Sequence, residues 1–140
     1  MMKRPELLRW LRLIAPLTVL LILIQAIFAG RGLFISADEL DLHGMIGNLT
    51  FLVAIVQLVL VVLVGFSGRL GRQLLVMNAV MVVLLVAQLG LGYSGRDSST
   101  AAAIHVPTGV FIFGLGGAIA MLLSMLPSAD REAPTMHAER

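Results

Sequence analysis

Hydrophobic residues run through most of the chain in long blocks, and charged residues interrupt them at only a few places. Asp, Glu, Lys and Arg are absent from four stretches, which are residues 13–30, 44–68, 73–95 and 98–129. At about 1.5 Å per residue, each stretch is long enough to cross the roughly 30 Å hydrocarbon core of a bilayer as a helix. The pattern predicts four transmembrane helices, at about residues 10–30, 37–66, 72–93 and 99–126.

The short connections between these helices determine their arrangement. Helices that follow one another in the sequence are expected to be antiparallel neighbours, which gives an all-α, integral membrane four-helix bundle of up-down-up-down topology. Residues 1–126 form one domain with no room for a soluble catalytic module. Residues 127–140 are polar and are predicted to be a disordered cytoplasmic tail, in which His137 is interpreted as a solvated residue.

Basic residues are unevenly distributed between the two ends of the predicted bundle. Most lie before the first helix, in the second loop or in the tail: Lys3, Arg4, Arg9, Arg12, Arg69, Arg72, Arg131 and Arg140. Only Arg31 and Arg96 fall at the opposite end, and the first loop there is acidic. Because Lys and Arg in short loops are retained on the cytoplasmic side, both termini are predicted to be cytoplasmic.

The composition excludes several classes of protein. With 59% hydrophobic residues, 13% charged residues and a mean hydropathy of +0.98, the chain is not a soluble globular domain. The net charge of +2 is explained by the basic residues on the predicted cytoplasmic side. It gives no reason to expect nucleic-acid binding. Cysteine is absent, which excludes disulfides and cysteine-ligated iron–sulfur clusters. The apolar run from Leu13 to Ala29 is long for a signal peptide, so we expect a retained span.

Two histidines lie near the starts of the second and fourth predicted helices. Ser36 and Glu39 match a Ser-x-x-Glu capping box, which places His43 seven residues past the cap. With Ser98 as the cap of the fourth helix, His105 is also seven residues in. The two helices run in the same direction and are diagonal in the bundle, so the histidines should face each other in the outer leaflet. They are candidate axial ligands of one haem b.

A porphyrin also needs space beside its ligands. Small residues follow both histidines at helical spacing, and we expect the cofactor to lie against Gly47, Thr50, Gly109 and Gly116. Small residues also allow membrane helices to pack closely, and this alternative stays open.

Polar side chains are predicted in the same leaflet as the histidines. Gln25, Gln88 and Asn48 are placed to orient the imidazoles, contact haem propionates or bind a quinone headgroup. Hydrogen bonding among themselves is the alternative. Gln57 and Asn78 lie deeper and are interpreted as interhelical hydrogen-bonding residues.

The few charged residues at this end have more than one predicted role. Arg31 and Arg96 are suited to pairing with propionates. Their alternative partners are Asp38 and Asp97. Glu39 precedes His43 by about one turn and would accept its second N–H, unless the capping box holds it.

The layout of His43 and His105, which are 62 residues apart with a carboxylate one turn before the first, resembles one half of heme A synthase. The segments IFAGRGLF, DLHGMIGNL and AAIHVPTGVFIFGL are similar to a family of small bacterial four-helix membrane proteins with no assigned function. This similarity implies a bacterial cytoplasmic (inner) membrane protein. Gly44 and Val106 follow the histidines where heme A synthase typically has Arg, and the second bundle is lacking, so synthase activity is not expected.

Three functional hypotheses follow from these residues. The first is a haem-b-binding membrane protein that serves electron transfer or haem handling near the outer leaflet. The second is a non-catalytic accessory or structural subunit, and the third is an enzyme acting on a lipid or quinone. No nucleophile and base pair or nucleotide motif is present, so no catalytic residue is assigned. The expected partners are the lipid bilayer and a redox partner, a quinone or a larger membrane complex, while self-association is left open.

Overall fold

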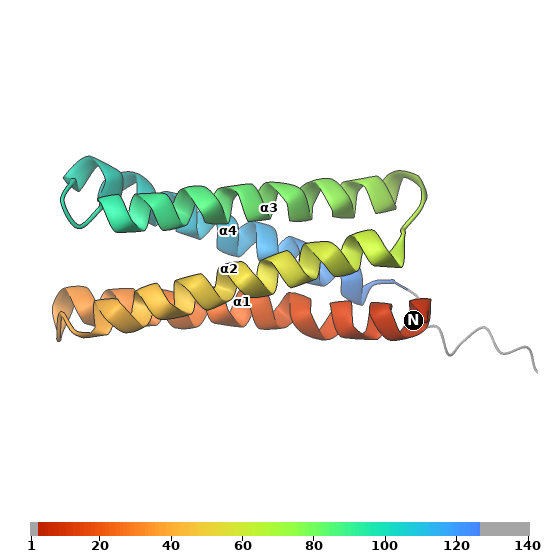
Figure 1. Ribbon diagram of the computed structural model, residues 1–140, viewed down its shortest axis with the longest axis horizontal. Helices are drawn as coiled ribbons and strands as arrows, with labels where there is room; N and C mark the ends of the chain where they lie inside the picture. Colours follow the sequence, from red (N-terminus) through yellow and green to blue (C-terminus); the bar gives the residue numbers. More distant parts are fainter. Residues whose placement is uncertain (1–2, 127–140) are drawn as a thin grey trace, which may run out of the picture.

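The computed structural model describes residues 3–126 and consists there of four long helices. Their bounds are Arg4–Phe34 for α1, Glu39–Val64 for α2, Gly68–Ser94 for α3 and Ser99–Ser124 for α4. Both α1 and α3 lie against α2 and α4 (Figure 1). The predicted four-helix bundle is therefore confirmed, with α2 and α4 as diagonal partners. The predicted disordered tail, with His137, lies outside the described residues.

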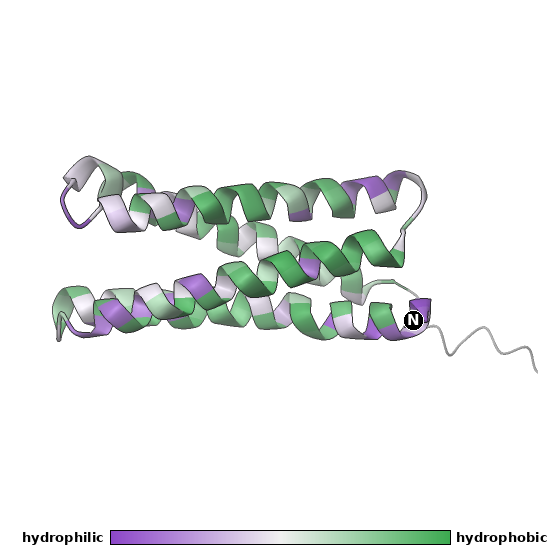
Figure 2. Ribbon diagram, viewed as in Figure 1, coloured by the Kyte–Doolittle hydropathy of each residue, from purple (hydrophilic) through white to green (hydrophobic). Residues whose placement is uncertain are grey.

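The surface of the bundle is suited to lipid. All four helices are long and apolar enough to cross a membrane. Large apolar side chains point outward along each helix, among them Leu20, Val83 and Val110. In Figure 2, hydrophobic residues dominate the middle of the helices and hydrophilic ones are more frequent toward the ends. The chain is a multi-pass membrane protein.

The first helix is longer than hydropathy predicted. It begins at Arg4 rather than at residue 10 and continues to Phe34 rather than to residue 30. Its start is stabilised by Pro5 in the first turn and by Glu6, whose carboxylate accepts a hydrogen bond from the Lys3 backbone N–H at 3.1 Å. Hydropathy marks the part of a helix that lies in hydrocarbon, and this helix extends beyond that part at both ends.

The predicted capping box at the start of α2 is wrong. The helix begins at Glu39 and has Asp38 as its N-cap, without a side-chain capping hydrogen bond. The backbone N–H of Ser36 donates instead to the carbonyl of Arg31 at 3.1 Å, so Ser36 follows the C-cap Ile35 and helps to close the end of α1. The Glu39 carboxylate is not free to reach back because it is paired with the Arg31 guanidinium.

The other predicted boundaries agree more closely with the structure. Ser98 caps α4 as predicted, since its Oγ accepts a hydrogen bond from the Ala101 backbone N–H at 3.3 Å. The second helix ends at Val64, two residues before the predicted end, because Gly65 adopts the left-handed conformation with φ of 62°.

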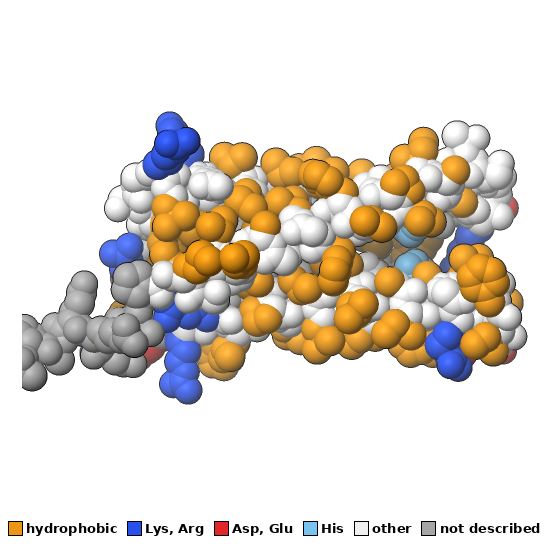
Figure 3. Space-filling view, turned by 180° about the vertical axis from the view of Figure 1, so that it is seen from behind, with side chains coloured by type: hydrophobic (Ala, Val, Ile, Leu, Met, Phe, Trp, Pro, Cys, Tyr) orange, Lys and Arg blue, Asp and Glu red, His pale blue; other side chains and the backbone are white. Residues whose placement is uncertain are grey.

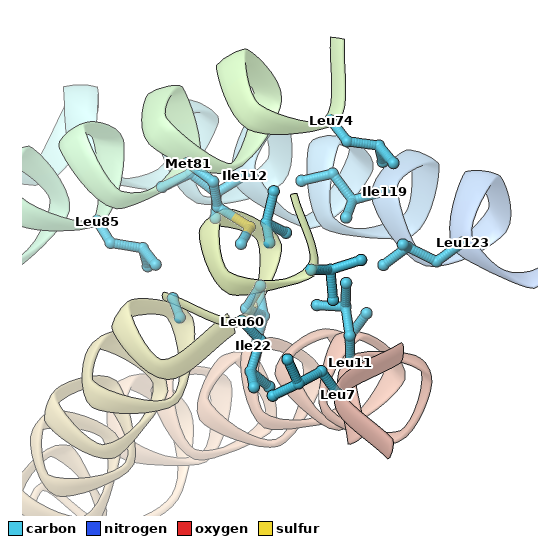
Figure 4. Close-up of a cluster of buried hydrophobic side chains, with 14 residues drawn as sticks. Leu7, Leu11, Ile22, Leu60, Leu74, Met81, Leu85, Ile112, Ile119 and Leu123 are labelled. Atoms are coloured by element: carbon cyan, nitrogen blue, oxygen red, sulfur yellow. The ribbon is translucent and has the colours of Figure 1, made fainter. Parts of the chain in front are cut away.

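The buried apolar side chains gather between the four helices (Figure 4), mainly in one half of the bundle's length. Its fully buried side chains include Leu11, Leu74, Ile119 and Leu123. All of the buried apolar residues fall within residues 7–22, 54–64, 74–85 and 112–123. These segments lie toward the end formed by residues 3–12, 65–72 and 122–126, here called the basic end. The opposite end, formed by residues 31–43 and 91–105, is called the histidine end.

A buried polar layer crosses the bundle within this core. Gln57 on α2 donates from Nε2 to Asn78 Oδ1 on α3 at 2.7 Å, and the Thr18 hydroxyl on α1 lies 2.8 Å from Gln57 Oε1. Asn78 Nδ2 donates to the Leu74 carbonyl at 2.7 Å. The layer joins three helices by hydrogen bonds, the role predicted for Gln57 and Asn78.

Candidate functional site

The structure brings the two predicted ligand residues together. His43 on α2 and His105 on α4 have ring centroids 5.8 Å apart, with the ring planes inclined by 75°. His43 is five residues past the Asp38 cap and His105 seven residues past the Ser98 cap, so their equal depth does not come from equal spacing.

Each imidazole is held by a backbone carbonyl of the preceding helix. His43 Nδ1 lies 2.8 Å from the carbonyl oxygen of Gln25, and His105 Nδ1 lies 3.1 Å from that of Gln88. A carbonyl can only accept, so each Nδ1 must carry the proton of its neutral ring. The Nε2 atom of each histidine then has an unprotonated lone pair, which is the form that binds a metal.

The two hairpins, α1–α2 and α3–α4, carry the same set of residues at this level. Each has a glutamine on its first helix, a histidine on its second helix and a glycine four residues after the histidine. The glycines make room for the glutamine side chains. A Cβ added at Gly47 would lie 2.9 Å from Gln25 Oε1, and one added at Gly109 would lie 3.0 Å from Gln88 Nε2. The candidate site is thus made of two half-sites with the same three residue types, one from each hairpin.

A cavity of about 250 Å³ lies beside the histidines and is lined by all four helices. Its polar lining comes from His43 and His105, Gln25 and Gln88, Tyr93 and Arg96, and the rest is mainly apolar or glycine. In Figure 3 histidine side chains are visible inside a hollow in the side of the bundle. The cavity therefore opens sideways, toward the region that lipid occupies around a membrane-spanning bundle.

Three of the six residues predicted to contact the cofactor line this cavity, namely Gln25, Gly47 and Gln88. Gly109 is not part of the lining, although a Cβ added there would lie 3.0 Å from Gln88 Nε2. Thr50 and Gly116 do not line the cavity either. Thr50 is fully buried, with its hydroxyl bonded to the Ile46 carbonyl at 2.7 Å. Gly116 lies against Val19 and Ile22 of α1. Both are further toward the basic end, where the helices converge and the core is packed.

Gln88 carries a buried acceptor without a donor. Its Nε2 donates to the His105 carbonyl at 2.8 Å, which fixes the orientation of the amide. Its Oε1 is buried and has no hydrogen-bond partner among the described residues. Leaving such an atom unsatisfied costs about 1–3 kcal/mol. The cavity is therefore a place where a water molecule or a ligand group that donates a hydrogen bond is favoured.

The charged residues of the histidine end have other partners than those predicted. Arg31 pairs with Glu39 rather than Asp38, and Glu39 consequently does not accept from His43. Arg96 Nη2 lies 3.6 Å from Asp41 Oδ1, so its ion-pair partner is Asp41 and not Asp97.

Asn48 also lies apart from the histidines. It is exposed, and its Nδ2 donates to the Tyr93 hydroxyl at 3.1 Å. This contact joins α2 to α3 at the histidine end.

Sequence reasoning missed the contribution of α3. A Cβ added at Gly92 would lie 3.0 Å from His105 Cε1, so this glycine makes room for the imidazole. Tyr93 and Arg96 line the cavity from the same segment. The available signal was the run LGLGYSG, residues 89–95, in which glycines recur near the end of a helix that has no histidine.

The arrangement limits what kind of metal centre fits. Within residues 3–126, no three His, Cys, Asp or Glu side chains come close enough to hold a metal ion. Any further His, Cys, Asp or Glu ligand of a metal bound by His43 and His105 would therefore have to come from outside residues 3–126. A metal that brings its own equatorial ligands, as haem iron does, meets this condition.

Comparison with known proteins places the chain among related sequences. Residues 25–94, half of the 140 residues, match the family of unknown function DUF6220. The chain belongs to this family. The matched segment contains Gln25, His43 and Gln88 but ends before His105. No curated protein and no solved structure matches the chain. The resemblance to heme A synthase thus rests on the layout of the two histidines.

Proposed function

We propose that this protein binds one haem b, with His43 and His105 as axial ligands, and serves electron transfer or haem handling. The observation that carries the proposal is the pair of imidazoles from diagonal helices, which lie close together and line the same cavity, each with Nδ1 held by a carbonyl. Two metal–imidazole bonds of about 2 Å each, together with the ring radii, place the centroids of two opposed axial imidazoles about 6 Å apart. The separation of 5.8 Å agrees with this value.

The inclination of the two rings is also compatible with axial ligation. Rotation of an imidazole about its metal–nitrogen bond leaves the bond length unchanged, so planes inclined by 75° can both bind. The carbonyls of Gln25 and Gln88 would hold each ring at a fixed rotation.

The cavity gives room for part of the macrocycle. Its volume of about 250 Å³ is slightly below the roughly 300–1,000 Å³ of most ligand pockets. The side opening would accommodate the remainder, with the edge of the ring in contact with lipid. Gly47, Gly92 and Gly109 leave the space in which the side chains of Gln25, His105 and Gln88 lie, so these side chains fit between the helices beside the cavity.

The ligand set favours electron transfer or haem carriage over chemistry on a substrate. Bound haem would supply a single reversible electron transfer at its iron. With one histidine on each face, the chain would leave no coordination position open for a substrate. A redox partner, a quinone or a larger membrane complex would then exchange electrons or haem with the site through the side opening or the histidine end.

The distribution of Lys and Arg supports a location for the site. Lys3, Arg4, Arg9, Arg12, Arg69 and Arg72 all lie at the basic end. By the positive-inside tendency, the basic end and both termini would be cytoplasmic. The histidine end would then lie in the outer leaflet of the bacterial cytoplasmic membrane.

An absorption spectrum of the detergent-purified protein tests the proposal. The protein is titrated with haemin, and spectra are recorded in the oxidised and the reduced state. We expect the sharp Soret and α bands of six-coordinate haem in the wild type. Both His43→Ala and His105→Ala should lose these bands, because each removes one axial ligand.

The third histidine provides a matched control. His137→Ala removes an imidazole from the chain outside the proposed site and should leave the spectrum unchanged. A wild-type protein that refuses haemin would contradict the proposal, as would six-coordinate bands that survive both alanine substitutions.

A further inference from the structure

The two half-sites contain the same glutamine, histidine and glycine but differ at the rim of the cavity. Each hairpin has one arginine near its loop, Arg31 in the first and Arg96 in the second. Arg31 is bound by both carboxylate oxygens of Glu39 and does not line the cavity. Arg96 does line it, and apart from the histidines it is the only charged side chain that does so in the described part of the chain.

Arg96 is weakly held where it stands. Its contact with Asp41 is long, 3.6 Å, and the two side chains are 62% and 80% exposed. Exposed ion pairs of this kind contribute little, so Asp41 is a partner that another anion can displace. The guanidinium is planar and presents paired donors, which suits it to a carboxylate.

From this asymmetry we infer that Arg96 binds the anionic group of an amphiphilic ligand and so fixes which way round that ligand lies in the cavity. The apolar body of the ligand lies between the hairpins beside the histidines, and its carboxylate points to the rim at the end of α3. Without Arg96, no Lys or Arg of residues 3–126 would line the cavity to hold the anionic group of the ligand at this rim. This inference rests on the proposed function, in which the ligand is haem b and the anionic groups are its propionates.

Haemin and its dimethyl ester distinguish the role of the carboxylates from that of the iron. The ester keeps the macrocycle and the iron but has no anionic group. Dissociation constants of both compounds are measured by absorbance titration in detergent for the wild type, Arg96→Gln and Arg96→Lys. We expect Arg96→Gln to weaken haemin binding about tenfold and to leave ester binding unchanged, with Arg96→Lys in between because it keeps the charge without the planar donors.

Arg31→Gln is the matched control. It removes the same charge from the same end of the bundle, at a residue that does not line the cavity. It should change both dissociation constants by less than about threefold, since exposed charges at a distance are screened. Size-exclusion chromatography confirms that each variant is folded; Arg96 itself is exposed and contributes nothing to the core.

The outcomes separate this inference from the proposed function. If the wild type binds haemin and the ester equally tightly, or if Arg96→Gln weakens both alike, the assignment of Arg96 is wrong and haem binding by the histidines stands. If Arg31→Gln has the same effect as Arg96→Gln, the effect is one of general charge and the assignment also fails. If the wild type binds neither compound, both proposals fall together.

Discussion

His43 and His105 lie on helices that are diagonal in the bundle, yet their ring centroids are only 5.8 Å apart. Each side chain is fixed within its own hairpin, by Gln25 and by Gln88 respectively. Neither hairpin contains a complete site, and the two imidazoles meet only when the hairpins dock. The geometry of the site therefore reports directly on the docking of the two halves of the chain.

The space beside His105 depends on Gly92. A Cβ at this position would lie 3.0 Å from the imidazole Cε1, on a ring that the Gln88 carbonyl holds in place. Gly92→Ala should push the ring aside and weaken haemin binding about tenfold, since overpacking typically costs about 1–3 kcal/mol. Absorbance titration measures the effect.

Gly90 is the control for this substitution. It lies on the same helix, and an added Cβ would meet nothing within 4 Å. Gly90→Ala should therefore bind haemin as the wild type does. If the wild type, Gly92→Ala and Gly90→Ala bind haemin with equal affinity, the His105 imidazole is not confined by α3.

Replacing one axial histidine by methionine should raise the reduction potential of bound haem. A thioether in place of an imidazole raises the potential in proteins with one histidine and one methionine ligand. We expect His105→Met and His43→Met to shift the midpoint in the same direction, because the two half-sites contain the same residue types. Potentiometric titration followed by absorbance measures the shift. Unchanged potentials in both variants would mean that the iron is not bound by these residues.

The transmembrane helices and the proximity of the two histidines could be predicted from the sequence, because both depend on the positions of residues within single helices. The four spans follow from charge-free stretches, and the pairing of His43 with His105 follows from their similar position on parallel helices. The capping box at Ser36 was wrong because Arg31, which precedes it, takes the Glu39 carboxylate that the motif requires. A short motif does not reveal a competing partner on the preceding helix.

The remaining parts of the site depend on where the helices converge. Thr50 and Gly116 have helical spacing from the histidines, as Gly47 and Gly109 do, but they lie in the packed half of the bundle. Gly92 lies on a helix without a histidine, and its role appears only when α3 is placed beside α4. Spacing along one helix cannot give the distance between two helices.

The buried polar layer should stabilise the fold without affecting the site. Gln57→Leu removes the hydrogen bond that Gln57 donates to Asn78 and the one that it accepts from Thr18, and it leaves Asn78 Oδ1 without this donor. We expect a loss of about 1–2 kcal/mol in the free energy of unfolding, with an unchanged haem spectrum. Unfolding by sodium dodecyl sulfate in mixed micelles measures this loss.

Gln73→Leu is the control for the polar layer, because it is the same substitution at an exposed position of α3. It should leave the unfolding free energy nearly unchanged. A similar loss in both variants would indicate that the effect comes from changed hydrophobicity and not from the interhelical hydrogen bonds.

Salt should weaken the binding of haemin but not that of its dimethyl ester. Arg96 is exposed, so its attraction for a carboxylate is screened as the Debye length falls from about 30 Å at 0.01 M to about 3 Å at 1 M salt. Titrations over this range should show a haemin affinity that falls several-fold and an ester affinity that stays level. Parallel curves for the two compounds would contradict a role for the carboxylates.

The concentration of the apolar core in the basic half gives the molecule a closed floor. Beneath the cavity lie the hydrogen-bonded residues Thr18, Gln57 and Asn78, and beyond them the fully buried Leu11, Leu74 and Leu123. Among residues 3–126, these buried side chains fill the bundle between the cavity and the basic end. A ligand that enters beside the histidines would therefore enter and leave through the side opening or the histidine end.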